Sequence, residues 1–196
     1  MSTPLSKEQR SAIMASIRSK DTGPEMTLRR ALWARGFRYR VNVRSIPGTP
    51  DIVLPKYRSV IFVNGCFWHA HEGCSKYSRP KTNTEFWSGK IKNNRRRDAE
   101  VSAHLQGLGW SVITVWECET EKGRLEKTLD TVADKLRENR FLYLSEKSRR
   151  REQRERDRQL SKEKRLREEA LKASLAPSLH ISSRARALSR NEEDSI

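Results

Sequence analysis

The segment from Trp110 to Trp116, Trp-Ser-Val-Ile-Thr-Val-Trp, is the strongest strand signal in the chain. β-Branched and aromatic residues favour strands, and Gly109 separates this segment from a long polar helix that we predict over about residues 84–108. A strand that follows a helical crossover commonly lies parallel to an earlier strand. The segment therefore predicts an α/β fold with a small mixed central sheet flanked by helices.

The earlier part of the chain supplies partner strands. Two short apolar runs, Asp51–Leu54 and Val60–Val63, flank a turn at Pro55–Arg58 and predict a buried hairpin. A further strand is predicted over Phe37–Val41, where apolar and polar residues alternate as they do in a sheet with one solvent-exposed face.

Capping signals and helical spacing of apolar residues predict three other helices. The first covers about residues 7–18 and follows a capping-box pattern of Ser6 and Gln9. The second begins near Thr22 and ends at Gly36. The last covers roughly residues 121–139, with four aliphatic residues on one face: Leu125, Leu129, Val132 and Leu136.

The charge of the chain indicates its class of partner. Among 196 residues, 41 Lys and Arg oppose 25 Asp and Glu, which leaves a net charge of +16 and a pI near 10.3. Such a field attracts polyanions, so nucleic acid is the first expectation and an anionic membrane surface the second. The N-terminus has no secretory-signal pattern, and no apolar run approaches the roughly 18 residues of a membrane helix. We therefore expect a cytoplasmic protein.

Composition changes near residue 146. Residues 147–172 contain twelve Lys and Arg but six Asp and Glu, and their leucines form no adequate packing face, which indicates a solvated charged helix or disorder. Residues 173–196 are rich in Ser, Ala and Arg and are expected to be disordered. Without residues 147–196 the remaining chain still carries a net charge of +10, so the basicity also belongs to the folded part.

The loop predicted over residues 65–83 holds two cysteines and two histidines. Cys118 lies just past the predicted strand that could bring it alongside. Thiolate and imidazole donors suit tetrahedral Zn²⁺, and a closed site can hold a loop that lacks a hydrogen-bonded ladder. Such a Cys3His site, with His69 left over, would consist of Cys66, His71, Cys74 and Cys118. The alternative is that Cys118 is a buried core thiol and the histidines face solvent.

Two acidic residues are candidates for chemistry. Asp51 follows Pro50 at the mouth of a predicted strand, where a carboxylate could hold Mg²⁺ against a phosphodiester. The alternative is that this aspartate caps a turn or pairs with an arginine. Glu25 lies in the first turn of its helix, a position that the helix dipole alone would favour.

Aromatic and basic residues suggest a nucleic-acid surface. The adjacent pairs Phe67-Trp68 and Phe86-Trp87 cannot easily be buried together in one small core, and exposed rings can stack on bases. Ordinary core packing is the alternative for any one ring. Lysines and arginines crowd the helix over 84–108, where they form either a phosphate-contacting surface or a merely solvated face.

Several of these segments together resemble the very short patch repair endonuclease family. They match in order over about residues 7–140, and the most specific is the block Gly-Cys-Phe-Trp-His-x-His-x-x-Cys. The matching segments are Arg10–Glu25, Pro50-Asp51, Phe62–His69, Thr84–Trp87 and Val115–Cys118. The resemblance implies a restriction-endonuclease-like core of the PD-(D/E)xK type, a structural zinc, and a Mg²⁺-dependent nick in one strand beside the thymine of a T·G mismatch. Such mismatches arise when 5-methylcytosine deaminates.

The resemblance also implies roles for individual residues. Asp51 and the backbone carbonyl of Val63 would hold Mg²⁺, and His69 would act as general base or orient the attacking water. Glu25 would support the active site, and zinc would take the four ligands named above. The resemblance assigns Phe67, Trp68 and Trp87 to insertion from the major groove, and the first helix, with Met14, to the minor groove. Further predicted DNA contacts lie on and just before the basic helix over 84–108: Lys81, Lys90, Lys92 and Asn93.

The chain departs from the family pattern at Asn64, which we place in the catalytic group. Known members have a histidine there, and an asparagine cannot take up a proton near neutral pH. The Glu-x-Lys of many restriction-type nucleases is also absent, with Phe62-Val63-Asn64 in its place. Two alternatives remain open: a restriction-type endonuclease that cuts both strands of an unmodified site, and a zinc-stabilised DNA-binding protein with weakened catalysis.

The resemblance completes the expected organisation. We expect a DNA-contacting helix over 1–20, a nuclease domain over 21–146 that contains the zinc loop 65–83, and a basic tail over 147–196 outside the resemblance. The expected partner is double-stranded DNA with a T·G mismatch, and mismatch-repair proteins and a repair polymerase are candidate partners. We expect a bacterial, nucleoid-associated monomer that binds no membrane.

Overall fold

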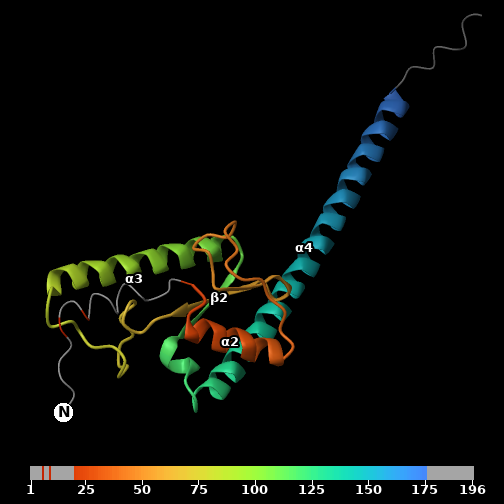
Figure 1. Cartoon of the computed structure of the whole chain (residues 1–196). Coiled ribbons are helices and arrows are strands. Elements are labelled where there is room, and N and C mark those ends of the chain that lie inside the picture. The colour runs from red at the N-terminus through yellow and green to blue at the C-terminus, as the bar shows by residue number, and fades with distance from the viewer. Residues whose placement is uncertain (1–5, 7–8, 10–19, 176–196) are drawn as a thin grey trace, which may run out of the picture. The chain divides into compact units, whose positions relative to one another are not determined.

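The computed structural model describes Ser6, Gln9 and residues 20–175 (Figure 1). The chain divides into a first unit that ends at Ser145 and a second that begins at Glu146. The predicted helix over 7–18, including Met14, lies outside the described residues except for Gln9, which is helical. The predicted capping box is confirmed. The Gln9 N–H donates to Ser6 Oγ at 3.2 Å, and the Ser6 N–H donates to Gln9 Oε1 at 2.9 Å.

A mixed three-stranded sheet forms the centre of the first unit. β1 (Ile52–Leu54) pairs antiparallel with β2 (Ser59–Asn64), and β2 pairs parallel with β3 (Ser111–Trp116). A short 3₁₀ helix, η1 (Pro55–Tyr57), and a left-handed Arg58 connect β1 to β2. The structure thus confirms the hairpin, the parallel strand after the crossover and the small mixed sheet.

The strand predicted over Phe37–Val41 is wrong. Among the described residues, this segment joins the sheet only through an isolated antiparallel bridge between Arg40 and Val53. β1 is three residues long and offers little edge to pair with, and Asn42 adopts a left-handed φ of 48° that turns the chain away. The alternation has another cause, because Phe37 packs into the core while its neighbour Arg38 is exposed.

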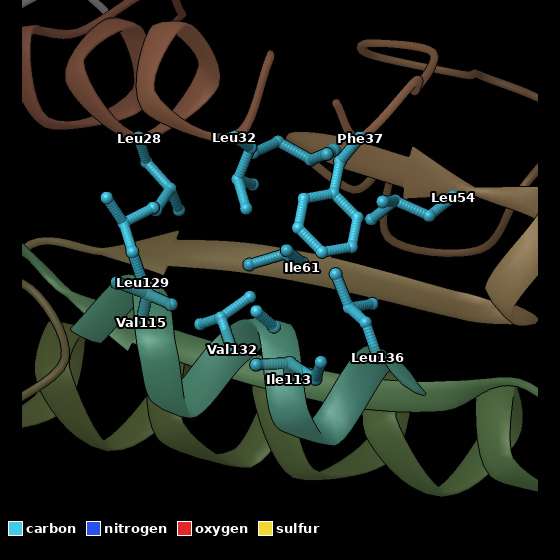
Figure 2. Packing of buried hydrophobic residues seen from close by; sticks show 12 residues of the cluster. Leu28, Leu32, Phe37, Leu54, Ile61, Ile113, Val115, Leu129, Val132 and Leu136 are labelled. Atoms are coloured by element: carbon cyan, nitrogen blue, oxygen red, sulfur yellow. The ribbon is translucent and has the colours of Figure 1, made fainter. Parts of the chain in front are cut away.

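Helices cover both faces of the sheet, as expected for an α/β fold. One face packs Ile61 and Ile113 against α2 (Gly23–Ala34) and the beginning of α4 (Leu125–Leu175), where Leu28, Leu32, Leu129, Val132 and Leu136 converge (Figure 2). The other face packs Val53 and Val60 against Leu105 of α3 (Thr84–Gly107). Successive β2 side chains therefore belong to opposite layers.

α4 is longer than the helix predicted over 121–139. Leu129, Val132 and Leu136 are buried on one face, as predicted. The same helix then continues to Leu175, and every residue from 146 to 175 is exposed. Of the two predicted alternatives for residues 147–172, the structure shows the solvated helix and not disorder. Strong helix formers and pairs such as Arg150 with Glu146 account for this helicity. No helix in the described part of the chain has the length and apolarity to cross a membrane.

Candidate active site and metal cluster

A cleft of about 1040 Å³ lies at the sheet edge where β1 begins and β2 ends. Because an antiparallel hairpin brings the start of one strand beside the end of the other, Asp51 and Asn64 both line this cleft. His69, from the loop after β2, and Asp98, from α3, line the same cleft. Glu25 from α2 completes the set, so five separate segments contribute polar side chains.

Asp51 is held by backbone contacts at the floor of the cleft. The Val63 N–H donates to Asp51 Oδ2 at 2.7 Å, and the Arg29 guanidinium donates to the Asp51 carbonyl at 3.1 Å. The pKa of the Asp51 carboxyl is raised to about 6, because burial and the nearby Glu25 together outweigh the lowering effects of the Val63 N–H, Arg29 and His69. A bound cation would favour the ionised carboxylate, and oxygen donors suit Mg²⁺.

His69 is oriented by a partner that sequence reasoning missed. Its Nδ1 bonds the Asp98 carboxylate, which leaves Nε2 as the nitrogen available for chemistry. One turn earlier on α3, the Asn94 side chain donates to the Trp68 carbonyl at 2.9 Å, so one face of α3 holds the loop at two successive residues. The i, i+4 spacing of these two short polar residues within an arginine-rich helix was the available signal.

Glu25 has a more specific environment than the helix dipole alone provides. It is 4% exposed, and its carboxylate accepts hydrogen bonds from the Asp21 N–H at 3.0 Å, the Thr22 hydroxyl at 2.8 Å and the Arg29 guanidinium at 3.0 Å. Arg29 also pairs with Asp21 and is itself buried. This network ties the start of α2 to the backbone of Asp51, so it supports the floor of the cleft.

A second centre lies where the loop after β2 meets the end of β3. The ligand atoms of its four residues all lie within 4.8 Å of one another: Cys66, His71, Cys74 and Cys118. His71 Nδ1 lies 3.5 Å from Cys66 Sγ and 3.4 Å from Cys118 Sγ. The His71 ring stacks on Trp116 with centroids 4.1 Å apart and an interplanar angle of 1°. The structure thus assembles the four predicted donors, and His71 is packed against the strand end.

The chemistry of these donors fits zinc. Burial raises the pKa of the Cys66 thiol to about 12 and also raises the pKa of the Cys118 thiol. Buried thiols therefore favour the neutral form unless a cation compensates the thiolate charge, as Zn²⁺ does in tetrahedral sulfur and imidazole sites. This arrangement favours the metal interpretation over an unrelated core thiol with solvent-facing histidines. Zinc binding itself stays a prediction.

Polar contacts fasten the loop to η2 (Glu117–Thr120), the short 3₁₀ helix that carries Cys118. The Cys66 N–H donates to Glu117 Oε2 at 3.3 Å. Lys76 Nζ lies 3.1 Å from Glu117 and 2.8 Å from Glu121. The same loop presents His69 to the cleft and His71 to the cluster.

Comparisons with known proteins identify the family to which this arrangement belongs. The family model described as "DNA mismatch endonuclease Vsr" matches residues 3–76. The type II nicking enzyme V.XorIIP of Xanthomonas oryzae is 45% identical over 135 residues, which cover 68% of this chain and 98% of that protein. The chain belongs to the Vsr family.

Two further relatives agree with this assignment. The DNA mismatch endonuclease Vsr of Escherichia coli K12 is 43% identical over 132 residues, which cover 67% of this chain and 83% of that protein. The type II nicking enzyme V.NmeAIP of Neisseria meningitidis is 46% identical over 119 residues, 61% of this chain and 84% of its own. The resemblance noted from the motifs is therefore confirmed at the level of the Vsr family.

Four aromatic rings of this Vsr-family chain form one cluster beside the cleft. Trp87 contacts the other three, with centroid distances of 5.2 Å to Phe67, 5.8 Å to Trp68 and 5.2 Å to Phe86. Phe67 and Trp68 also line the cleft that holds His69. Phe86 is 64% exposed, so at least one ring is available to a partner, although it was not among the predicted DNA contacts.

The predicted polar DNA contacts lie on and just before α3. Lys90, Lys92 and Asn93 are exposed on the helix, and Lys81 is exposed in the segment before it. These positions are accessible to a phosphate backbone, and their contact with DNA stays a prediction. The predicted contact through Met14 lies outside the described residues.

Proposed function

We propose that this Vsr-family protein is a DNA mismatch endonuclease that hydrolyses one phosphodiester bond beside the thymine of a T·G mismatch. The observation that carries the proposal is the meeting of Asp51 with the His69–Asp98 pair in one cleft at the edge of the sheet. A carboxylate can hold the metal ion, and an oriented imidazole can act as general base, so together they can support metal-assisted hydrolysis. The sheet, with its acidic residue at a strand edge and helices on both faces, supports a restriction-endonuclease-like core.

Each residue in the cleft has a distinct role in this proposal. Asp51 and the carbonyl of Val63 would hold Mg²⁺, which supplies charge neutralisation for the phosphoryl and leaving oxygens. His69 Nε2 accepts a proton from the attacking water, while Asp98 fixes the ring and stabilises the imidazolium that results. Asn64 orients water by hydrogen bonding but takes up no proton, so proton transfer depends on His69 alone.

The substrate is double-stranded DNA in this proposal. Residues 1–146 carry a net charge of +10, which favours a polyanion, and the aromatic cluster adjoins the reacting groups. A ring that wedges into the stack costs less free energy at a mismatch than at a matched pair, which supports selectivity for T·G. The nicked strand then requires a repair polymerase, and mismatch-repair proteins are the proposed further partners.

A nicking assay with end-labelled duplexes tests the proposal. We expect Mg²⁺-dependent cleavage of the thymine strand of a T·G duplex and no cleavage of the matched duplex. His69→Ala should lower the single-turnover rate by roughly 10²–10⁴-fold, because general-base catalysis contributes about that much. Asp51→Asn should reduce it at least as strongly, and both variants should retain DNA binding.

Other outcomes identify the alternatives. Cleavage of both strands in a matched duplex would favour a restriction-type enzyme. Mismatch binding without a nick at any Mg²⁺ or Mn²⁺ concentration would favour a non-catalytic binding protein. Parent rates in both variants would show that the assigned chemistry is wrong.

A further inference from the structure

The second unit carries its basic side chains unevenly around α4. At 3.6 residues per turn, seven of them lie within an arc of about 80° on one face of the helix. We call this set the basic stripe, and it consists of Lys147, Arg151, Arg154, Arg158, Lys162, Arg165 and Lys172. All seven side chains are exposed.

Acidic residues compensate little of this charge. Within the described residues, the only ion pair made by the basic stripe joins Arg165 to Glu169 at 3.4 Å, near its C-terminal end. By the same helical geometry, Glu169 lies within the arc and Glu155 lies about 20° beyond its edge. The other acids of residues 147–172 lie farther outside the arc: Glu152, Asp157, Glu163 and Glu168. From Lys147 to Arg165 the arc contains no acidic residue, so this part of the stripe is a continuous positive surface whose charges the helix holds in a row before any partner binds.

We propose that the basic stripe binds the phosphate backbone of duplex DNA, as a second contact surface besides the mismatch site. It spans 26 residues, or about 37 Å at 1.5 Å per residue, which is about the length of one turn of duplex DNA. The proposal rests on the proposed function for the identity of the ligand. The contact reads no bases, so it raises the affinity for matched and mismatched DNA alike.

The composition of the helix favours DNA over an anionic membrane. A membrane-surface helix needs a broad apolar face opposite its basic residues. The leucines of this segment do not form one, because Leu166 lies on a different side from Leu160 and Leu171, and Asp157 and Lys164 lie beside the latter pair. Phosphate is therefore recognised here by charge alone.

Two full-chain variants with equal charge test the stripe. The first is Arg151→Gln, Arg154→Gln and Arg158→Gln on the stripe, and the control is Arg149→Gln, Arg156→Gln and Arg167→Gln on the opposite face. Each removes three positive charges, and glutamine keeps a helix propensity close to that of arginine. Affinity for a fluorescent matched duplex of about 40 base pairs is measured against NaCl concentration without Mg²⁺, and circular dichroism checks the helix.

We expect the stripe variant to lower the log–log salt slope by about 0.9 for each lost phosphate contact, or roughly two to three in total. The control variant should lower it by less than about one. Equal salt slopes in the two variants would overturn the proposal, because the net charge of the helix, and not one of its faces, would then account for DNA binding. Unchanged DNA binding with lost binding to anionic phospholipid vesicles would overturn it in favour of a membrane partner.

Cleavage is measured separately with the T·G duplex. If the parent protein binds DNA with the expected difference between variants but does not nick, the proposed function fails and the basic stripe stands. If the parent nicks and the two variants have equal slopes, the proposed function stands and the basic stripe fails.

Discussion

The cleft and the metal cluster contain two histidines, His69 and His71, that lie two residues apart on the same loop. His69 Nδ1 bonds the carboxylate of Asp98, and the ring lies in an open cleft. His71 Nδ1 lies beside two thiols, and its ring stacks on Trp116. Residue type is therefore a poor guide to role in this loop, because the partner of each ring decides what that ring can do.

The two centres also differ in how complete they are. The cluster assembles four protein donors, which is the coordination number of a closed structural zinc site. The cleft offers Asp51 and few other ligands, and so leaves positions for water and a phosphate group. We therefore expect substitutions in the cluster to affect stability and substitutions in the cleft to affect rate.

The largest expected effect is at the cluster. Cys118→Ser removes one soft donor, and the variant should lose its bound zinc and unfold at a clearly lower temperature. Structural zinc contributes about 10–16 kcal/mol in small zinc-dependent peptides, so even partial loss is several kcal/mol here. Zinc content by mass spectrometry and thermal unfolding with and without a chelator measure the effect.

His69→Ala is the matched control on the same loop. It should keep its zinc and its unfolding temperature, because His69 is outside the proposed ligand set. Loss of zinc in His69→Ala and retention in Cys118→Ser would show that the ligand set is wrong.

A smaller effect is expected at Asp98. Asp98→Asn removes the carboxylate that orients His69 and should lower the nicking rate by roughly 10²–10⁴-fold, as expected when an imidazole loses its tautomer and its charge partner. Zinc content and KM for the duplex should stay near the parent values. The rate constant comes from single-turnover nicking at saturating enzyme.

Asp134→Asn serves as the control for Asp98→Asn. Asp134 pairs with Arg137 on the exposed surface of α4, so its replacement should leave the rate unchanged. A parent rate in Asp98→Asn would contradict the assigned orientation of His69.

The smallest expected effect is a pH dependence that belongs to the cleft. Asp51 has a raised pKa of about 6, so its carboxyl is protonated below that pH and a poorer metal ligand. The nicking rate at subsaturating Mg²⁺ should fall by about tenfold or more per pH unit below about 6, because Asp51 must be ionised and the general base His69 must be unprotonated. More Mg²⁺ should move this acidic limb to lower pH, because the cation competes with the proton.

Glu25→Gln sharpens the pH experiment. Glu25 raises the pKa of Asp51, so removal of the Glu25 charge should move the acidic limb of the pH–rate profile to lower pH. A limb that does not move in this variant would show that Asp51 does not control it.

Local sequence patterns were sufficient for several parts of this protein. The capping box of Ser6 and Gln9, the hairpin and the strand Ser111–Trp116 depend on neighbouring residues and on the period of apolar side chains, and the structure confirms them. The strand predicted over Phe37–Val41 failed because a strand also needs a partner of sufficient length, and β1 has three residues.

The sequence alone determined the α/β elements, the basic charge and a donor set that suits zinc, because spacing and residue chemistry are local properties. Only the tertiary structure decided that Asp98 of α3 meets His69, that Trp116 stacks on His71, and that Glu25 and Arg29 support the floor of the cleft. These contacts join residues from separate elements, and their pairing depends on how helices pack on the two faces of the sheet. A local pattern such as the polar i, i+4 pair on α3 marks a helix face, but it does not identify the partner of that face.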